Sequence, residues 1–207
     1  QESAGLAQKG GSTWAHVYIA HRQEDIRTTR VSMASADLIL GCDPIVTAGK
    51  ETLQRMLHGR THVALNAYST PTAAFVKDGG WNNPGAQCLT AIEQVVGAGQ
   101  LGHFDANAVA LQALGDSIYI NPMILGYAWQ RGWIPLGRES LLRAIELNEV
   151  AVEHNKQAFE WGRQCAHDWS RVEAVLKPAQ VVQFKPRETL EALIERRANF
   201  LVNYQNA

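Results

Sequence analysis

The sequence has 207 residues, of which 46% are hydrophobic and 19% are charged, and its formal net charge is -1 at pH 7. This length and composition suit a domain with a buried core and exclude a chain that is mainly disordered. The near-zero net charge excludes a general affinity for nucleic acid. The lack of a long apolar run excludes a transmembrane helix. We therefore expect neither nucleic acid nor a membrane as a partner.

The N-terminal stretch GLAQKGGSTWAHVYIAH joins a glycine-rich basic turn to residues of alternating character. The alternation predicts a strand over residues 12–20, whose more apolar face, with Val17 and Ile19, points into the core. Glycines allow close approach to the backbone, and Lys9 among them can hold a carboxylate or a phosphate. Spacing alone nevertheless favours an ordinary exposed turn with a solvated Lys9.

Residues 36–115 alternate between two kinds of pattern. Short apolar runs that end in polar residues predict buried parallel strands, and the stretches between them predict helices. This order is typical of a parallel sheet with helices on its faces. The predicted strands cover 36–43, 62–68 and 101–106, and the helices run from Pro44 to about Leu57, from Cys88 to about Val96 and from 106 to near Gly115.

The second half is predicted to be helical, and its last helix carries an apolar stripe that suits packing on its own domain or docking on another. The two halves together predict an α/β fold: a three-layer α/β/α arrangement with a mostly parallel sheet, followed by a helical C-terminal half. The predicted helices cover 117–132, 138–148, 150–168 and 187–207, with an irregular tail over 169–184.

The three cysteines, Cys42, Cys88 and Cys165, are far apart in the sequence, and no C-x-x-C pair occurs. An odd and dispersed set does not form a disulfide framework and suits a reducing compartment, so we expect a cytoplasmic protein. The seven histidines are also scattered, without H-x-x-x-H spacing. We therefore expect no metal site and no iron–sulfur cluster held by this chain alone.

Polar residues stand at the ends of the predicted strands, where open parallel sheets bind their ligands. Asp43, Asn66 and Asn107 should meet at this edge, which makes them candidate contacts to a ligand. Capping of the next helix is the competing role, and we favour it for Asp43 and Asp105. Asn66 is followed by a loop, so for it we favour contact with a ligand or a neighbouring chain.

Several stretches in a fixed order resemble the gamma-type domain of 2-oxoacid:ferredoxin oxidoreductases: GLAQKGG, ADLILGCD, GRTHVALN and ILGYAWQRGWIPLGRESLLRAIELNEVAVEHNKQAFEWGR. The likeness spans nearly the whole chain and is greatest to the fused bacterial indolepyruvate ferredoxin oxidoreductases. It implies a gamma-type domain over residues 1–167 that lacks its N-terminal strand–turn–helix unit. It also implies an extension over 168–207 that ends in an amphipathic linker helix, and we expect the chain to be a fragment of a longer protein.

The resemblance implies an enzyme that oxidatively decarboxylates a 2-oxoacid to its acyl-CoA and passes the electrons to ferredoxin. An aryl pyruvate such as indolepyruvate is the expected substrate. Thiamine diphosphate, coenzyme A and iron–sulfur clusters serve the whole enzyme, and the implied thiamine and cluster sites lie in other domains. We expect this chain to bind no cofactor and to be inactive alone, with those domains or subunits, ferredoxin, the 2-oxoacid and further copies of itself as partners.

In that family, the basic Gly-Gly loop of this domain faces the substrate side of the thiamine site. Carried onto this sequence, the resemblance implies Lys9 as the catalytic residue, with Gln8, Gly10 and Gly11 beside it as contacts to substrate or coenzyme A. Lys9 would pair with the substrate carboxylate or with a nearby coenzyme A anion, since one placed cation can orient a carboxylate for its loss.

Two other functions stay open on the sequence. The apolar helical half, which is rich in tryptophan, suits a non-catalytic domain that organises neighbouring domains or a dimer. A free-standing nucleotide-binding α/β protein is the third hypothesis, and the lack of a phosphate-binding loop argues against it.

Overall fold

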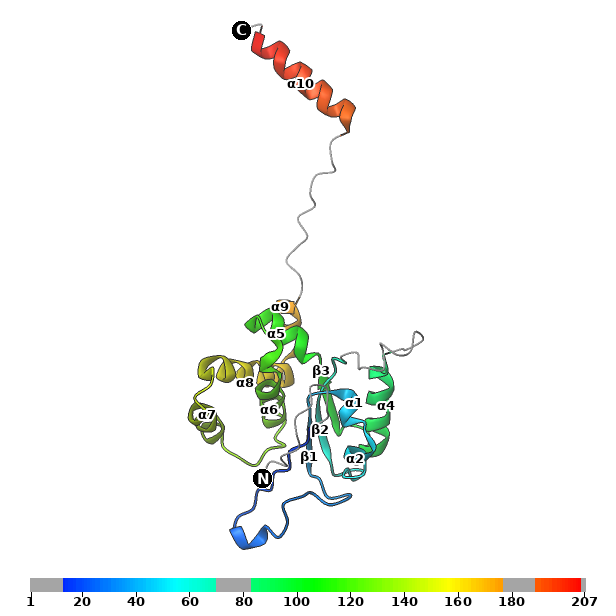
Figure 1. Cartoon of the computed structure of the whole chain (residues 1–207), viewed down its shortest axis with the longest axis vertical. Coiled ribbons are helices and arrows are strands. Elements are labelled where there is room, and N and C mark those ends of the chain that lie inside the picture. Colours follow the sequence, from blue (N-terminus) through cyan, green and yellow to red (C-terminus); the bar gives the residue numbers. More distant parts are fainter. Residues whose placement is uncertain (1–12, 70–82, 177–188, 206–207) are drawn as a thin grey trace. The chain divides into compact units, whose positions relative to one another are not determined.

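The computed structural model describes residues 13–69, 83–176 and 189–205 (Figure 1). The chain forms two units, residues 1–176 and residues 177–207. The first unit holds a sheet and the helices around it, and the described part of the second is one helix, α10 (Leu190–Gln205).

A parallel three-stranded sheet with strand order β1-β2-β3 lies at the centre of the first unit. Leu38 is opposite His62 in the β1–β2 ladder, and Val63 is opposite Leu101 in the β2–β3 ladder. All three predicted strands are confirmed, although each is shorter than its apolar run. Their bounds are Leu38–Gly41 for β1, His62–Asn66 for β2 and Leu101–Phe104 for β3.

Helices cover both faces of this sheet, as Figure 1 shows, so the predicted α/β class is confirmed. Val63 and Leu65 pack with Ile92 and Val96 of α4 on one face, and Ala64 packs with Met123 and Ile124 of α6 on the other. Alternate residues of β2 thus serve two separate cores. The bounds are Pro44–Thr47 (α1), Lys50–Leu53 (α2) and Gly85–Val96 (α4) on the first face, and Ala106–Leu114 (α5), Ile120–Gln130 (α6) and Val152–His167 (α8) on the second side.

The helical C-terminal half is confirmed as well. Its main contact joins α6 to α8, where Met123, Ile124 and Phe159 are fully buried. Phe104 at the end of β3 stacks on Tyr127 of α6, with 5.0 Å between ring centroids, and so ties the sheet to this helix pair. A short 3-10 helix, η2 (Ser117–Tyr119), precedes α6, and α7 (Arg138–Leu147) packs against α8.

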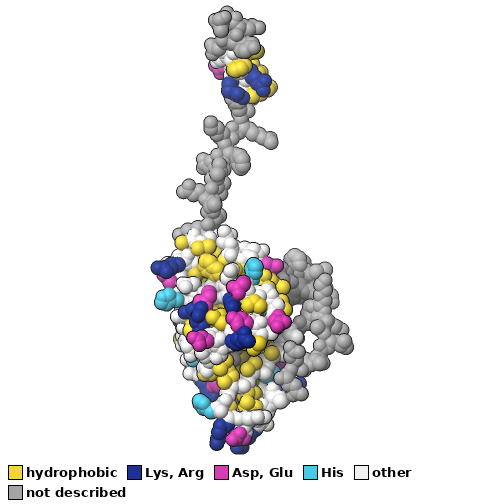
Figure 2. All heavy atoms as spheres, turned by 90° about the vertical axis from the view of Figure 1, so that its left-hand side faces the viewer, with side chains coloured by type: hydrophobic (Ala, Val, Ile, Leu, Met, Phe, Trp, Pro, Cys, Tyr) yellow, Lys and Arg dark blue, Asp and Glu magenta, His cyan; other side chains and the backbone are white. Residues whose placement is uncertain are grey.

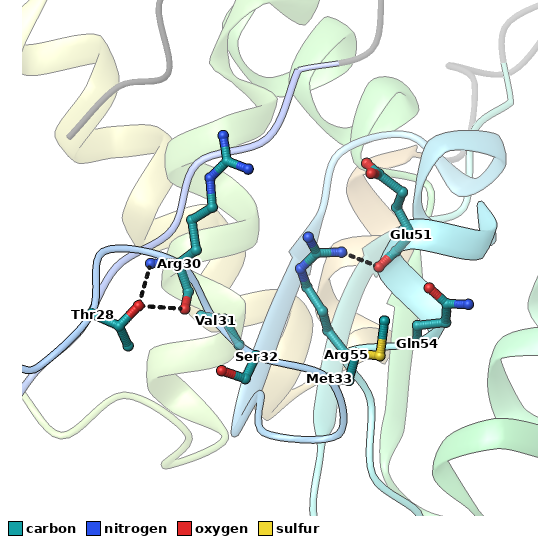
Figure 3. A pocket seen from close by; sticks show the side chains of 8 residues that line it. All are labelled: Thr28, Arg30, Val31, Ser32, Met33, Glu51, Gln54 and Arg55. Carbon is teal, nitrogen blue, oxygen red and sulfur yellow. Dashed lines mark hydrogen bonds between the residues drawn. The ribbon is translucent and has the colours of Figure 1, made fainter.

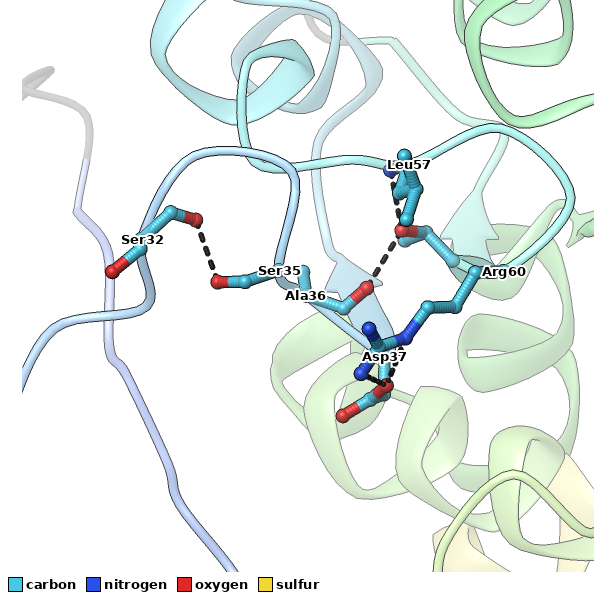
Figure 4. Close-up of polar contacts among 7 residues, drawn as sticks. Ser32, Ser35, Ala36, Asp37, Leu57 and Arg60 are labelled. Carbon is cyan, nitrogen blue, oxygen red and sulfur yellow. Dashed lines mark hydrogen bonds and ion pairs between the residues drawn. The ribbon is translucent and has the colours of Figure 1, made fainter. Parts of the chain in front are cut away.

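The connection into β2 is held at the end of the sheet where the strands begin (Figure 4). The hydroxyl of Thr61, a fully buried residue, donates to the carbonyl oxygen of Ala36 at 2.6 Å and accepts from the Leu57 amide at 2.7 Å. Arg60 adds an exposed ion pair with Asp37, 2.6 Å from Nη2 to Oδ1. These contacts fix the entry into β2 relative to the entry into β1.

The predicted strand over residues 12–20 is wrong for its described part, because residues 13–20 have no strand structure. The apolar face was also assigned wrongly: Val17 is 74% exposed, while the residues of the opposite face make the contacts. Trp14 Nε1 donates to Thr52 Oγ1 at 3.1 Å, and the Tyr18 hydroxyl donates to the Arg30 carbonyl oxygen at 2.9 Å. No described residue pairs with this segment in a sheet. Hydrogen bonds from its side chains hold it in place instead.

Two helix predictions also need correction. The helix expected from Pro44 to about Leu57 is two short helices, α1 and α2, because Gly49 has an extended conformation and begins a new helix. The tail over 169–184, predicted to be irregular, begins with a helix, α9 (Trp169–Leu176). At the start of this helix Oδ1 of Asp168 accepts from the Arg171 amide at 3.4 Å, and Val172 is buried in the core shared with α5 and α8.

Candidate functional site

Asn66 lies where the strand ends meet, as predicted, and all of its side-chain contacts there are within the protein. Its Nδ2 atom donates to the carbonyl oxygen of Cys42 at 3.1 Å and to Oδ1 of Asn107 at 2.9 Å. Its Oδ1 atom accepts from the amides of Ala106 at 3.0 Å and Tyr68 at 3.2 Å. Because Asn66 is only 2% exposed, the side chain joins the ends of all three strands from inside the protein.

Asp43 and Asp105 cap the helices that follow their strands, as favoured above. Oδ1 of Asp43 accepts from the amides of Ile45 at 2.7 Å and Val46 at 3.0 Å, at the start of α1. Oδ1 of Asp105 accepts from the amide of Ala108 at 2.8 Å, at the start of α5. The two carboxylates thus satisfy amides that the first turn of a helix leaves free.

The chemistry of this edge does not suit a polyanion. The amides at the starts of α1 and α5 are bonded to the caps, and the amide group of Asn66 is bonded to protein. The carboxylates of Asp43 and Asp105 would repel phosphate oxygens. The described strand-end residues therefore do not fit a pyrophosphate or a similar group.

The cysteines do not come together either. Cys88 and Cys165 are buried, and Cys42 keeps an accessible face at the end of β1. Burial and the Asp43 carboxylate raise the pKa of the Cys42 thiol, and burial raises the pKa of Cys165 to about 12. These thiols are protonated at neutral pH and so are poor nucleophiles. In the described ranges, no three His, Cys, Asp or Glu residues form a group that could hold a metal ion.

The residues of the basic turn, Gln8, Lys9, Gly10 and Gly11, lie outside the described residues. Their predicted roles in binding substrate or coenzyme A remain predictions.

A cavity of about 360 Å³ lies away from the strand ends, between the loop 28–33 and α2 with the residues that follow it (Figure 3). The cavity lies at the end of the sheet where the strands begin. Gln54 and Arg55, which line it, accept hydrogen bonds from the amides of Ala34 and Ala36, just before β1. Arg30 and Arg55 line it from these two segments. This site was not predicted from the sequence, where its only signal was the charge density between residues 22 and 30.

Acidic and basic side chains are interleaved on the face that carries α7 and α8 (Figure 2). Glu160 binds Arg138 and Arg163, each at 2.6 Å, and Glu146 binds Arg143 and Lys156, each at 2.8 Å. Hydrogen bonds from Lys156 and Arg143 hold the pKa of Glu146 below its usual range. The charges on this face thus compensate one another. Across the described segments, none of the helices has the length and apolar character needed to cross a membrane.

A comparison with protein-family models matches residues 1–165 to the model described as pyruvate ferredoxin/flavodoxin oxidoreductase. The match takes in the whole sheet and continues into α8. No curated protein and no solved structure gave a match to the chain.

Proposed function

This chain belongs to the pyruvate ferredoxin/flavodoxin oxidoreductase family, and on that premise we propose that it works as the gamma-type domain of a 2-oxoacid:ferredoxin oxidoreductase. The family match over residues 1–165 is the observation that carries the proposal. We assign the gamma-type domain to residues 1–167 and a C-terminal extension to 168–207. In this assignment the extension begins with α9, which packs on α5 and α8, and ends with α10.

The proposed reaction is the oxidative decarboxylation of an aryl pyruvate, such as indolepyruvate, to its acyl-CoA, with electrons passed to ferredoxin. Enzymes of this family use thiamine diphosphate, coenzyme A and iron–sulfur clusters. The described residues fit neither the pyrophosphate nor a cluster: the strand ends carry carboxylates and engaged amides, and the thiols are dispersed. We therefore assign those cofactors to other domains or subunits of a cytoplasmic enzyme and propose that this chain is inactive alone.

Within that enzyme, Lys9 is the residue we propose to act on the substrate. Its ammonium group would pair with the substrate carboxylate or with an anionic group of coenzyme A, and Gln8, Gly10 and Gly11 would form the loop that presents it. Asp43 and Asn66 were candidate contacts as well. Their caps and internal hydrogen bonds support a second role for them, that of holding the strand ends in place.

Two observations favour a second candidate function, a non-catalytic domain that organises its neighbours or a dimer. The polar atoms of Asn66 are all bonded within the protein, so this side chain has no polar group left for a ligand. The apolar residues of α10 are in addition exposed within its own unit, with Leu190 at 71% and Ile194 at 58%.

An activity assay tests the proposed function. The intact enzyme that contains this domain should reduce ferredoxin with indolepyruvate and coenzyme A, and faster than with pyruvate. The isolated 207-residue chain should show no turnover. Turnover by the isolated chain would contradict its proposed dependence on other domains, whereas an intact enzyme that oxidises no 2-oxoacid would leave assembly as the better assignment.

A further inference from the structure

The cavity between the loop 28–33 and α2 carries two arginines whose charges are not neutralised by ion pairs in the described structure. Arg30 lines it from the loop, and Arg55 lines it from the residues after α2. Figure 3 shows the two side chains extending from separate segments of the chain, Arg30 from the loop and Arg55 from the residues after α2. Within residues 13–69, 83–176 and 189–205, the exposed arginines Arg22, Arg60 and Arg138 each have a carboxylate partner, and neither cavity arginine has one.

Arg55 is held in place, yet one of its donors has no acceptor. Its Nη1 atom donates to the carbonyl oxygen of Glu51, one turn earlier, which fixes the guanidinium group beside the cavity. Its Nε atom is buried and has no hydrogen-bond partner among the described residues. A buried donor without an acceptor costs free energy, so the guanidinium group that lines the cavity is not fully satisfied within the described residues.

The charges around the cavity favour an anion. Arg30 and Arg55 contribute two positive charges and Glu51 one negative charge, which leaves a net charge of about +1 at the lining. His16 is nearby, because its Nδ1 atom accepts from the amide of Val31, a lining residue, at 3.2 Å. Burial, Arg55 and Arg30 lower the pKa of His16, in that order, whereas Glu51 raises it. Burial is the largest cause, and the two arginines act on His16 in the same direction.

We propose that this cavity binds the oxyanion group of a small organic molecule, a phosphate or a carboxylate, between Arg30 and Arg55. Guanidinium groups bind both kinds of oxyanion through short, charge-assisted hydrogen bonds. The volume of about 360 Å³ is sufficient for a small metabolite and lies at the low end of ligand pockets. The site is at the opposite end of the sheet from the carboxyl ends of the strands, and none of its lining residues belongs to the turn that contains Lys9.

Titration of the full chain with inorganic phosphate or with succinate, at constant ionic strength, tests the site by NMR of the arginine Nε–H groups. We expect a saturable shift of the signal that Arg55→Gln removes. Arg30→Gln should weaken binding by about tenfold, since each lost charge-assisted contact is worth at least that factor. Arg30 is exposed on a loop, so this variant tests the site without depending on the packing around Arg55.

Two further variants make the test specific. Arg22→Gln removes an arginine that pairs with Asp25 outside the cavity, and it should leave the dissociation constant within about twofold. Glu51→Gln should tighten binding by about threefold, because it removes the negative charge from the lining. Of phosphate and succinate, the one that binds with the lower dissociation constant shows whether the site prefers a phosphate or a carboxylate. The proposal fails if neither produces a saturable shift up to about 50 mM, or if Arg22→Gln weakens binding as much as Arg30→Gln.

Discussion

Gly162 of α8 lies against the main chain of Met123 in α6, so close that a Cβ atom on the glycine would be 1.8 Å from the Met123 carbonyl oxygen. The contact is reciprocal, because a Cβ atom on Gly126 of α6 would be 2.0 Å from the carbonyl oxygen of Phe159 in α8. Both obstacles are backbone atoms, which cannot turn aside as a side chain does. The two helices approach this closely only because each has a glycine at the crossing.

Gly126→Ala and Gly162→Ala should each lower the free energy of unfolding by about 3 kcal/mol or more, since α6 and α8 must separate to admit the methyl group. Urea denaturation of the full chain measures the loss. Gly137→Ala is the matched control, because its new methyl group would have only Ser140 Oγ within 4 Å, at 3.9 Å, and its φ angle of -67° suits alanine. Equal stability of all three variants would contradict the tight crossing.

Asn66→Ala should lower the free energy of unfolding by about 3 kcal/mol, because it leaves the Ala106 amide and the Cys42 carbonyl without their partner in a buried place. Asn107→Ala leaves both of those contacts in place, removes only the acceptor at 2.9 Å from Nδ2 of Asn66, and should cost about 1 kcal/mol. The comparison separates the two roles considered for Asn66. A variant as stable as the parent chain, but with weakened substrate binding in the intact enzyme, would instead support direct contact with a ligand.

Lys9→Ala in the intact enzyme should raise KM for the 2-oxoacid or lower kcat by about tenfold or more, with the folding transition unchanged. Lys9→Arg keeps the charge and should recover part of the activity. Lys50→Ala, which changes an exposed lysine on α2, serves as the control and should be kinetically neutral. Unchanged kinetics in Lys9→Ala would remove Lys9 from the proposed catalytic role.

Stability should fall at alkaline pH through Cys165. Its thiol is buried, and burial raises its pKa from 9.0 to about 12, so the folded state keeps a proton that the unfolded state releases above pH 9. Stability is therefore fully present below pH 9 and declines as the pH rises towards 12, by about 4 kcal/mol at most for this group. Urea denaturation at several pH values should show a shallower decline in Cys165→Ala. Parallel pH profiles of the two proteins would contradict this assignment.

The regions whose structure could be predicted are those where one local pattern decides the outcome. The runs around Leu38–Gly41, His62–Asn66 and Leu101–Phe104 are apolar and continuous, as strands buried on both faces must be, and all three form the sheet. Asp43 and Asp105 cap the helices that follow them, because capping needs only a short acceptor side chain immediately before a helix.

The predictions are wrong or missing where the local structure depends on residues that are distant in the sequence. Residues 13–20 alternate like a strand, but a strand also needs a neighbour to complete its ladder, and alternation carries no information about that neighbour. Trp14 and Tyr18 instead bind Thr52 and a carbonyl of the loop before β1. The cavity between Arg30 and Arg55 was missed for the same reason, since its walls are 25 residues apart in the sequence and meet only in the fold.

The hydrogen bonds of Asn66 also determine which neighbouring positions can vary in related sequences. Cys42 and Ala106 contribute only backbone atoms to Asn66, so its contacts do not depend on the polarity of their side chains, although Ala106 is fully buried and has room only for a small one. Asn107 contributes its own side chain, so its replacement by an apolar residue leaves Nδ2 of Asn66 without one acceptor. Positions 66 and 107 should therefore change together among homologues, while positions 42 and 106 vary independently of them.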